Sequence, residues 1–168
     1  NISVRQLRHK DFIKNVKQAL SDSKLQPKFL ELEITESIMQ DINESAKILN
    51  ELKQLGVKIS IDDFGTGYSS LSILQCLPID TLKIDHSFIT GILYDLNTSA
   101  IVKTIIDMGR NLKLCVIAEG IESKKQAHFL NENRCFLGQG YLFCKPLPSD
   151  EVSDLFEDRH KNVNPFEI

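Results

Sequence analysis

The sequence of 168 residues lacks the features that mark several specialised classes of protein. No run of apolar residues approaches the roughly 20 that a membrane-spanning helix needs. The formal net charge of −3 gives no electrostatic basis for nonspecific binding of DNA or RNA. With 42% apolar and 26% charged residues, the composition is that of a globular protein. It excludes disordered, collagenous and coiled-coil chains, and the length predicts a single domain.

The sequence also lacks any C-x-x-C pair, although it contains four cysteines: Cys76, Cys115, Cys135 and Cys144. This spacing argues against a disulfide framework or a zinc site. We expect reduced, mostly buried thiols in a cytoplasmic protein, or in the cytoplasmic part of a larger, membrane-bound one. The chain begins with N-I-S, which is neither a signal peptide nor an initiator Met. We therefore expect that the first residue is a cut within a longer protein.

Short β-like runs alternate with longer helical patterns along the chain. The predicted strands cover residues 29–35, 57–62, 81–85, 114–118 and 140–143. The predicted helices cover residues 10–23, 45–55, 99–112, 124–133 and 150–158, with one more short helix before the third strand. We assign residues 1–158 to one domain and expect residues 159–168 to form a polar tail that frays.

Strands that alternate with helices indicate βαβ units and a parallel sheet. In the first predicted strand, Leu32 and Ile34 lie on one face, while Glu31 and Glu33 lie on the other. A doubly wound sheet is buried on both faces, so its strands would be nearly all apolar. Polar groups here gather at the carboxyl ends of the strands, where TIM-type barrels carry their catalytic residues. The pattern favours such a β/α barrel, with a sheet that has one solvent-exposed face as the alternative.

A complete barrel of this kind typically needs about 250 residues. The present chain has 168 residues and five or six candidate strands. We therefore expect an incomplete α/β barrel with mostly parallel strands, in which the N-terminal one or two βα units lie upstream of Asn1.

The strongest local motif is the run D-D-F-G-T-G-Y-S-S, which starts at Asp62 and Asp63. Two adjacent carboxylates end a predicted strand, and their side chains are expected to diverge, so that each could serve a different metal ion or one could bridge. Gly65 and Gly67 allow a positive φ or a close approach to a ligand. The serines after Gly67 are able to cap the next helix. An Asp-rich turn without a function is the alternative.

Other predicted strands also end in acidic, basic or amide side chains. These residues are Glu33, Glu36, Lys83, Asp85, Glu119, Glu122 and Gln139. Their carboxylates would repel one another at a barrel mouth unless cations lay among them. Oxygen ligands without His or Cys companions favour Mg²⁺ or Mn²⁺ over zinc. The four histidines show no spacing that is typical of metal ligands.

Taken together, these motifs resemble those of the EAL-domain cyclic di-GMP phosphodiesterases, which are bacterial TIM-barrel enzymes. The similarity runs from Asn1 to about Pro148, with the motifs in the family's order. The matching segments are N-I-S at 1–3, E-I-T-E at 33–36, D-D-F-G-T-G at 62–67, K-I-D at 83–85, A-E-G-I-E at 118–122 and Q-G-Y at 139–141. The resemblance implies hydrolysis of cyclic di-GMP to linear pGpG at a site with two Mg²⁺ or Mn²⁺ ions.

The resemblance also implies roles for individual residues. Asn1, Glu33 and Asp62 are similar to the ligands of one metal ion, and Asp62 and Asp63 to those of a second. Lys83 is similar to the residue that holds or activates the attacking water.

Further residues have implied roles in catalysis, in a supporting loop and in lining the site. Glu119 resembles a general base or a partner of the second metal. Glu36 is similar to a glutamate that braces the loop containing Gly65, Thr66 and Gly67. The residues that line the site or contact substrate would be Asp85, Glu122 and Gln139.

The sequence lacks the Glu-Ala-Leu stretch for which the family is named, with its metal-binding glutamate and its phosphate-binding arginine. We expect this stretch to lie upstream of Asn1, so that residues 1–158 are the C-terminal two-thirds of an EAL domain and the chain alone could be inactive. An incomplete barrel would leave unpaired strand edges, which predicts a homodimer or other self-association. Two alternatives to the enzyme are a degenerate domain that senses cyclic di-GMP and a metal-free scaffold that signals by dimerising.

Overall fold

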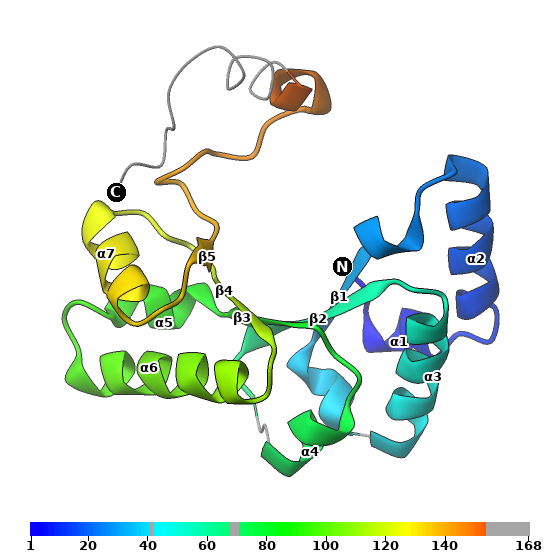
Figure 1. The fold of residues 1–168 in the computed structure, drawn as a ribbon, viewed down its shortest axis with the longest axis horizontal. Coiled ribbons are helices and arrows are strands. Elements are labelled where there is room, and N and C mark those ends of the chain that lie inside the picture. Colours follow the sequence, from blue (N-terminus) through cyan, green and yellow to red (C-terminus); the bar gives the residue numbers. More distant parts are fainter. Residues whose placement is uncertain (41, 68–70, 154–168) are drawn as a thin grey trace.

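The computed structural model describes residues 1–40, 42–67 and 71–153, and it shows one sheet of five parallel strands (Figure 1). The strands lie side by side in chain order, and each pairs with the next in parallel. Their bounds are β1 (Glu31–Thr35), β2 (Lys58–Phe64), β3 (Thr81–Ile84), β4 (Cys115–Ala118) and β5 (Leu137–Gly138). Parallel neighbours need crossover connections, and helices supply most of them. The predicted parallel α/β sheet is therefore confirmed.

Most of the helices lie against one face of this sheet and beside its ends (Figure 1). The longer ones are α2 (Phe12–Ser23), α3 (Ile42–Gln54), α6 (Leu96–Asn111) and α7 (Lys124–Glu132). The shorter ones are α1 (Val4–Leu7), α4 (Leu71–Cys76), α5 (His86–Gly91), and the 3₁₀ turns η1 (Pro27–Phe29) and η2 (Glu36–Gln40). Helix α3 contacts β2, while α6 contacts β3 and β4. These helices cover the apolar strand face and hold the sheet in place.

The core forms where the apolar strand residues meet the apolar stripes of α3 and α6. Ile59 and Ile61 of β2 and Leu82 and Ile84 of β3 are fully buried. From the helices, the fully buried side chains include Leu49, Leu52, Val102 and Ile106. Burying each such side chain contributes roughly 1.5–3 kcal/mol, so this layer fixes which strand face points away from the helices.

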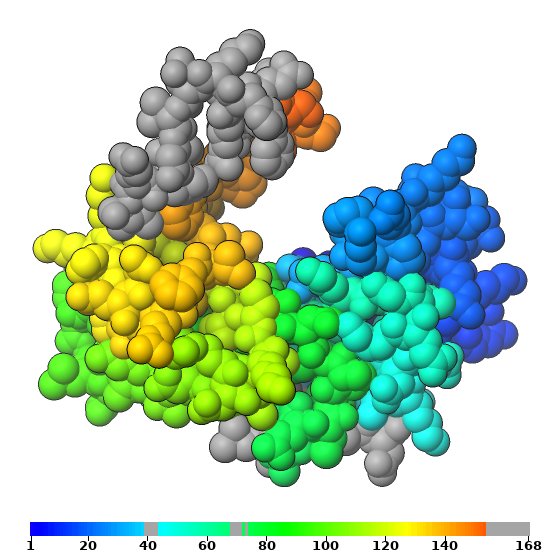
Figure 2. Space-filling model, in the orientation of Figure 1, coloured from blue at the N-terminus to red at the C-terminus, as the bar shows by residue number. Residues whose placement is uncertain are grey.

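The opposite strand face carries the polar side chains. Between the orange segment after β5 and the blue region around α2, the molecule is hollowed on this side (Figure 2). At the outer edge of β1, Ile2 forms a parallel bridge with Ile34, and its N–H donates to the carbonyl of Glu33 at 2.7 Å. Among the described residues, β5 is the opposite edge, and the sheet does not close into a barrel.

Four of the predicted strands match β1 to β4 with ends that differ by at most two residues. The fifth prediction, 140–143, is wrong, because the strand is Leu137–Gly138 and residues 141–143 form a turn. A strand of two residues has no room for the alternation that sequence analysis depends on. The short helices α1 and α5 were not predicted. Residues 149–153 are helical and form the start of the predicted closing helix. Three predictions lie outside the described residues: the rest of that helix, the tail at 159–168 and the two capping serines.

Of the four unpaired cysteines, only Cys135 is buried, so the prediction of mostly buried thiols is wrong. Cys115 is exposed because it occupies the strand face that no described helix covers. Across the described ranges, no helix is both long and apolar enough to cross a membrane.

Candidate active site

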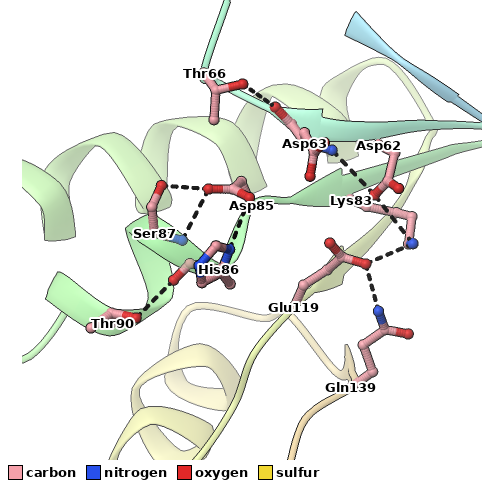
Figure 3. A network of polar contacts seen from close by, with 10 residues as sticks. All are labelled: Asp62, Asp63, Thr66, Lys83, Asp85, His86, Ser87, Thr90, Glu119 and Gln139. Atoms are coloured by element: carbon pink, nitrogen blue, oxygen red, sulfur yellow. Dashed lines mark hydrogen bonds and ion pairs between the residues drawn. The ribbon is translucent and has the colours of Figure 1, made fainter. Parts of the chain in front are cut away.

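The polar side chains predicted at the strand ends converge at one edge of the sheet (Figure 3). They do so because all five strands are parallel, so their carboxyl ends face the same way. Glu33 comes from β1, Asp62 and Asp63 from β2, and Lys83 from β3. Glu119 and Gln139 directly follow β4 and β5. Five consecutive strands therefore supply one cluster.

Lys83 lies at the centre of this cluster. Its Nζ is 2.6 Å from Glu119 Oε1, 2.9 Å from Glu33 Oε1 and 3.2 Å from Asp62 Oδ1. The side chain is only 6% exposed. Burial alone would lower the pKa of Lys83, but the hydrogen bonds to Glu119 and Glu33 outweigh it and raise the pKa above its usual value. The ammonium is thus held charged.

The two adjacent aspartates lie on a bulge in β2. Ile61 pairs with Leu82 and Phe64 with Ile84, so Asp62 and Asp63 together stand opposite Lys83 alone. Asp63 takes a left-handed backbone conformation with φ of 54°. Adjacent side chains diverge on a regular strand, but the bulge brings a carboxylate oxygen of each aspartate within 4.8 Å of the other and of one from Glu119.

Two carboxyl groups of the cluster have raised pKa values. For Asp63 the main cause is burial, and the negative charges of Asp62 and Asp85 add to it. Burial also raises the pKa of Glu119, and the nearby Lys83 only partly offsets this. Gln139 orients Glu119 by donating from Nε2 to Oε1 at 2.5 Å (Figure 3). Concentrated negative charge of this kind is what a cation would relieve.

Glu36, at the start of η2, holds the loop that follows the aspartates. Its Oε2 accepts hydrogen bonds from the backbone N–H groups of Gly65 at 3.1 Å and Gly67 at 3.0 Å. Gly65 has a φ of +101° and lies against the ring of Phe88, so a side chain would not fit there. Thr66 Oγ1 donates to the carbonyl of Asp63 at 2.9 Å, which ties the loop to the bulge.

Asp85 caps α5 and is buried beside Asp63. Its Oδ1 accepts from the backbone N–H of Ser87 at 3.0 Å and from the Ser87 hydroxyl, and its Oδ2 lies 3.2 Å from His86 Nδ1. Burial would raise the pKa of Asp85, but the Ser87 hydrogen bonds outweigh this and lower it. The sequence analysis missed His86 and Ser87, although an Asp at a helix start is itself a capping signal.

Two predicted site residues form no ion pair or side-chain hydrogen bond with Lys83 in the described part of the chain. Asn1 is exposed, and the parallel bridge between Ile2 and Ile34 places it beside Glu33, a member of the cluster. Glu122 is also exposed, and its backbone N–H donates to Gln126 at the start of α7.

The donor set fits a divalent metal ion. Asp62, Asp63 and Glu119 each offer a carboxylate oxygen, and these atoms lie close enough together to share one ion. Hard oxygen ligands without sulfur or imidazole suit Mg²⁺, Mn²⁺ or Ca²⁺. The cluster therefore has the chemistry of a metal site and, through Lys83, a cation that could face an anionic substrate.

A parallel α/β domain with acidic groups at the carboxyl ends of its strands is typical of metal-dependent barrel enzymes. The family model described as "EAL domain" matches residues 1–146, and the chain belongs to this family. The predicted family and its TIM-type fold are thus confirmed, since solved EAL structures match this chain over its sheet and helices.

Two relatives of the chain are named as phosphodiesterases. The chain is 46% identical over 149 residues to cyclic di-GMP phosphodiesterase NbdA of Pseudomonas aeruginosa, covering 88% of this chain and 19% of NbdA. It matches the structure of the PaMucR phosphodiesterase in a c-di-GMP complex with a TM-score of 0.88 and 43% identity, over 90% of this chain and 62% of that one.

A third comparison concerns metal. Klebsiella pneumoniae BlrP1, solved as a manganese and cyclic di-GMP complex, matches with a TM-score of 0.78 and 31% identity, over 84% of this chain and 36% of that one. The chain spans about a fifth of the length of the curated relatives it matches.

Proposed function

We propose that the protein to which this chain belongs hydrolyses one phosphodiester bond of cyclic di-GMP, giving linear pGpG. The observation that carries the proposal is the placement of the Lys83 ammonium among carboxylates from three strands. The names and ligands of EAL relatives support the substrate.

The carboxylates would hold divalent metal, Mg²⁺ or Mn²⁺. We assign Asn1, Glu33 and Asp62 to one ion, and Asp62 and Asp63 to a second. When bound, such ions lower the pKa of water and stabilise the charge that develops on a phosphodiester. The acidic cluster of Asp62, Asp63 and Glu119 supports this assignment.

Lys83 and Glu119 would act on the reacting groups. The buried ammonium of Lys83 supplies positive charge where phosphate charge develops, and it can orient the attacking water. Glu119 has a raised pKa through burial, which suits a group that accepts a proton. Gln139 fixes its orientation. Glu36 would keep the loop of Gly65, Thr66 and Gly67 in place, while Asp85 and Glu122 would line the site.

The test uses the longer protein that carries this chain with its upstream region. We expect conversion of cyclic di-GMP to pGpG, measured by chromatography, that EDTA stops and added Mg²⁺ or Mn²⁺ restores. Asp62→Asn and Lys83→Met should abolish it. The matched surface controls are Asp107→Asn and Lys47→Met, both at exposed helix positions, which should keep full activity. Binding of cyclic di-GMP without turnover would overturn the proposal in favour of a sensor.

We further propose that the 168-residue chain by itself self-associates through the β1 and β5 edges. Phe136, Leu137 and Tyr141 near β5 are 74%, 51% and 60% exposed, which supports an apolar contact there. Sedimentation should show a dimer or larger species, and a strictly monomeric profile would contradict this. The four unpaired cysteines support a reducing, cytoplasmic location.

A further inference from the structure

The ammonium of Lys83 has all three of its donors engaged. An ammonium carries three N–H groups and no acceptor. Glu33, Asp62 and Glu119 each place one oxygen within 3.2 Å of Nζ. These oxygens come from separate strands, and the two side chains of Asp62 and Glu119 are only 13% exposed. Lys83 therefore occupies the middle of the acidic cluster and neutralises part of it.

Two of those oxygens already have a second donor. Glu119 Oε1 also accepts from Gln139 Nε2 at 2.5 Å, and Asp62 Oδ1 also accepts from the backbone N–H of Asp63 at 3.1 Å. A carboxylate has about four lone-pair sites on two oxygens, so each of these oxygens has both of its sites in use. A metal ion needs a free lone pair on the oxygen that it binds, at about 2.0–2.6 Å.

Asp62 and Glu119 are also two of the three residues able to share a metal ion. We infer that Lys83 is a built-in competitor of the metal: its ammonium binds the same carboxylates and must leave Asp62 and Glu119 before metal binds through those oxygens. This inference rests on the proposed function and adds to it a control of metal affinity. Charge repulsion between the ammonium and a divalent ion acts in the same direction.

The competition has a functional consequence. Lys83 that is displaced from its carboxylates keeps a long, flexible side chain with a free ammonium. That ammonium would then be available to an anionic phosphodiester that approaches the cluster. Lys83 would thus be free for substrate in the metal-loaded protein and paired with carboxylates whenever metal is scarce.

The first experiment measures Mn²⁺ binding to the longer protein by isothermal titration calorimetry. In Lys83→Met, which keeps the length of the stem and removes the charge, the dissociation constant for Mn²⁺ should fall by at least about tenfold. The matched control is Lys58→Met. Lys58 is exposed and lies on the same face of β2 as Asp62, and solvent screens its charge, so this variant should change the dissociation constant for Mn²⁺ by less than about threefold. Equal or weaker binding by Lys83→Met would overturn the inference.

The second experiment follows the ammonium in the unaltered protein, so it does not depend on how the variant folds. Lysines are acetylated with an amine-reactive ester, with and without Mg²⁺, and each site is quantified by mass spectrometry. Acetylation of Lys83 should rise several-fold with Mg²⁺, while that of Lys47 stays constant. Unchanged or lower reactivity of Lys83 would overturn the inference. If the unaltered protein binds Mn²⁺ and cuts cyclic di-GMP, either negative result rejects only the competition; failure to bind Mn²⁺ rejects the proposed function too.

Discussion

The carboxyl group of Glu36 fills the space in which a side chain on Gly67 would lie. A Cβ on Gly67 would be 2.9 Å from the carboxyl carbon of Glu36, and the N–H of Gly67 donates to Oε2 of that group at 3.0 Å. The glycine is required by this close approach. The loop after the two aspartates is therefore fixed by one buried carboxylate from η2, the 3₁₀ turn that follows the neighbouring strand β1.

Glu36→Ala should remove the acceptor from two backbone donors. Hydrogen bonds to a charged group contribute about 1.5–3 kcal/mol, so we expect a loss of that order in the free energy of unfolding. In the active protein, displacement of the bulge should lower kcat/KM by about 100-fold. Urea denaturation and kinetics measure the two effects. Glu36→Gln keeps an acceptor, so its stability and kcat/KM should lie between those of the unaltered protein and those of Glu36→Ala. An alanine variant with unchanged stability would contradict this account.

Gly140→Ala should be among the most destabilising small substitutions. A Cβ there would be 2.2 Å from the backbone N and O of Ile121, and Ile121 N–H donates to the carbonyl of Gln139 at 3.0 Å. Overpacking against backbone costs about 1–3 kcal/mol, and we expect the upper end. Thermal unfolding measures it. Gly91→Ala is the control, because its nearest neighbour is a Thr98 methyl group at 3.1 Å, and it should cost clearly less.

Asp80 should matter more for stability than its ion-pair partner Lys53. Its carboxylate lies 2.7 and 2.8 Å from Lys53 Nζ, and Oδ2 also accepts from the N–H of Ile59 at 2.8 Å. Asp80→Ala leaves that buried N–H without its acceptor and should cost about 1–3 kcal/mol. Lys53→Met should cost about 1 kcal/mol or less, since the pair is 32% exposed. Equal losses in urea denaturation would contradict the ranking.

Asp95 should make stability depend on pH in the acid range. It caps α6, and hydrogen bonds from the Thr98 hydroxyl, Thr98 N–H and Asn97 N–H lower its pKa below the ordinary 3.8. Because the folded-state pKa is the lower one, its stabilisation is complete above the unfolded-state value and is lost as pH falls through the folded-state value. The difference in melting temperature between wild type and Asp95→Ala should be full at neutral pH and shrink in strong acid. A difference that does not change with pH would reject this.

The sheet could be predicted because the alternation of apolar and polar residues along its strands reflects one buried face and one polar face. Residues such as Ile59, Ile61 and Leu82 alternate with polar residues, and one face is buried while the other carries the site. Strand β5 was missed because an element of two residues is too short to show any period. Its position depends instead on packing, as in the contact between Gly138 and Ile121.

The sequence allowed the residues of the candidate site to be proposed, but not the way in which their side chains are placed relative to one another. Adjacent positions on a regular strand point to opposite faces, so the strand pattern alone does not place carboxylate oxygens of Asp62 and Asp63 within 4.8 Å of each other. The bulge that brings them together depends on the pairing of β2 with β3, which no local pattern shows. The central position of Lys83, bound by three carboxylates, likewise follows from the register of separate strands.

The left-handed backbone conformation of Asp63 sets the stability of the fold against the presence of a carboxylate at this position. Its φ of 54° is one that glycine adopts without the steric penalty imposed by a Cβ. A laboratory selection for thermal stability alone would be expected to enrich Gly at position 63, and each such variant would lose a carboxylate of the cluster. Stabilised variants that keep Asp63 must therefore owe their higher stability to substitutions elsewhere in the fold.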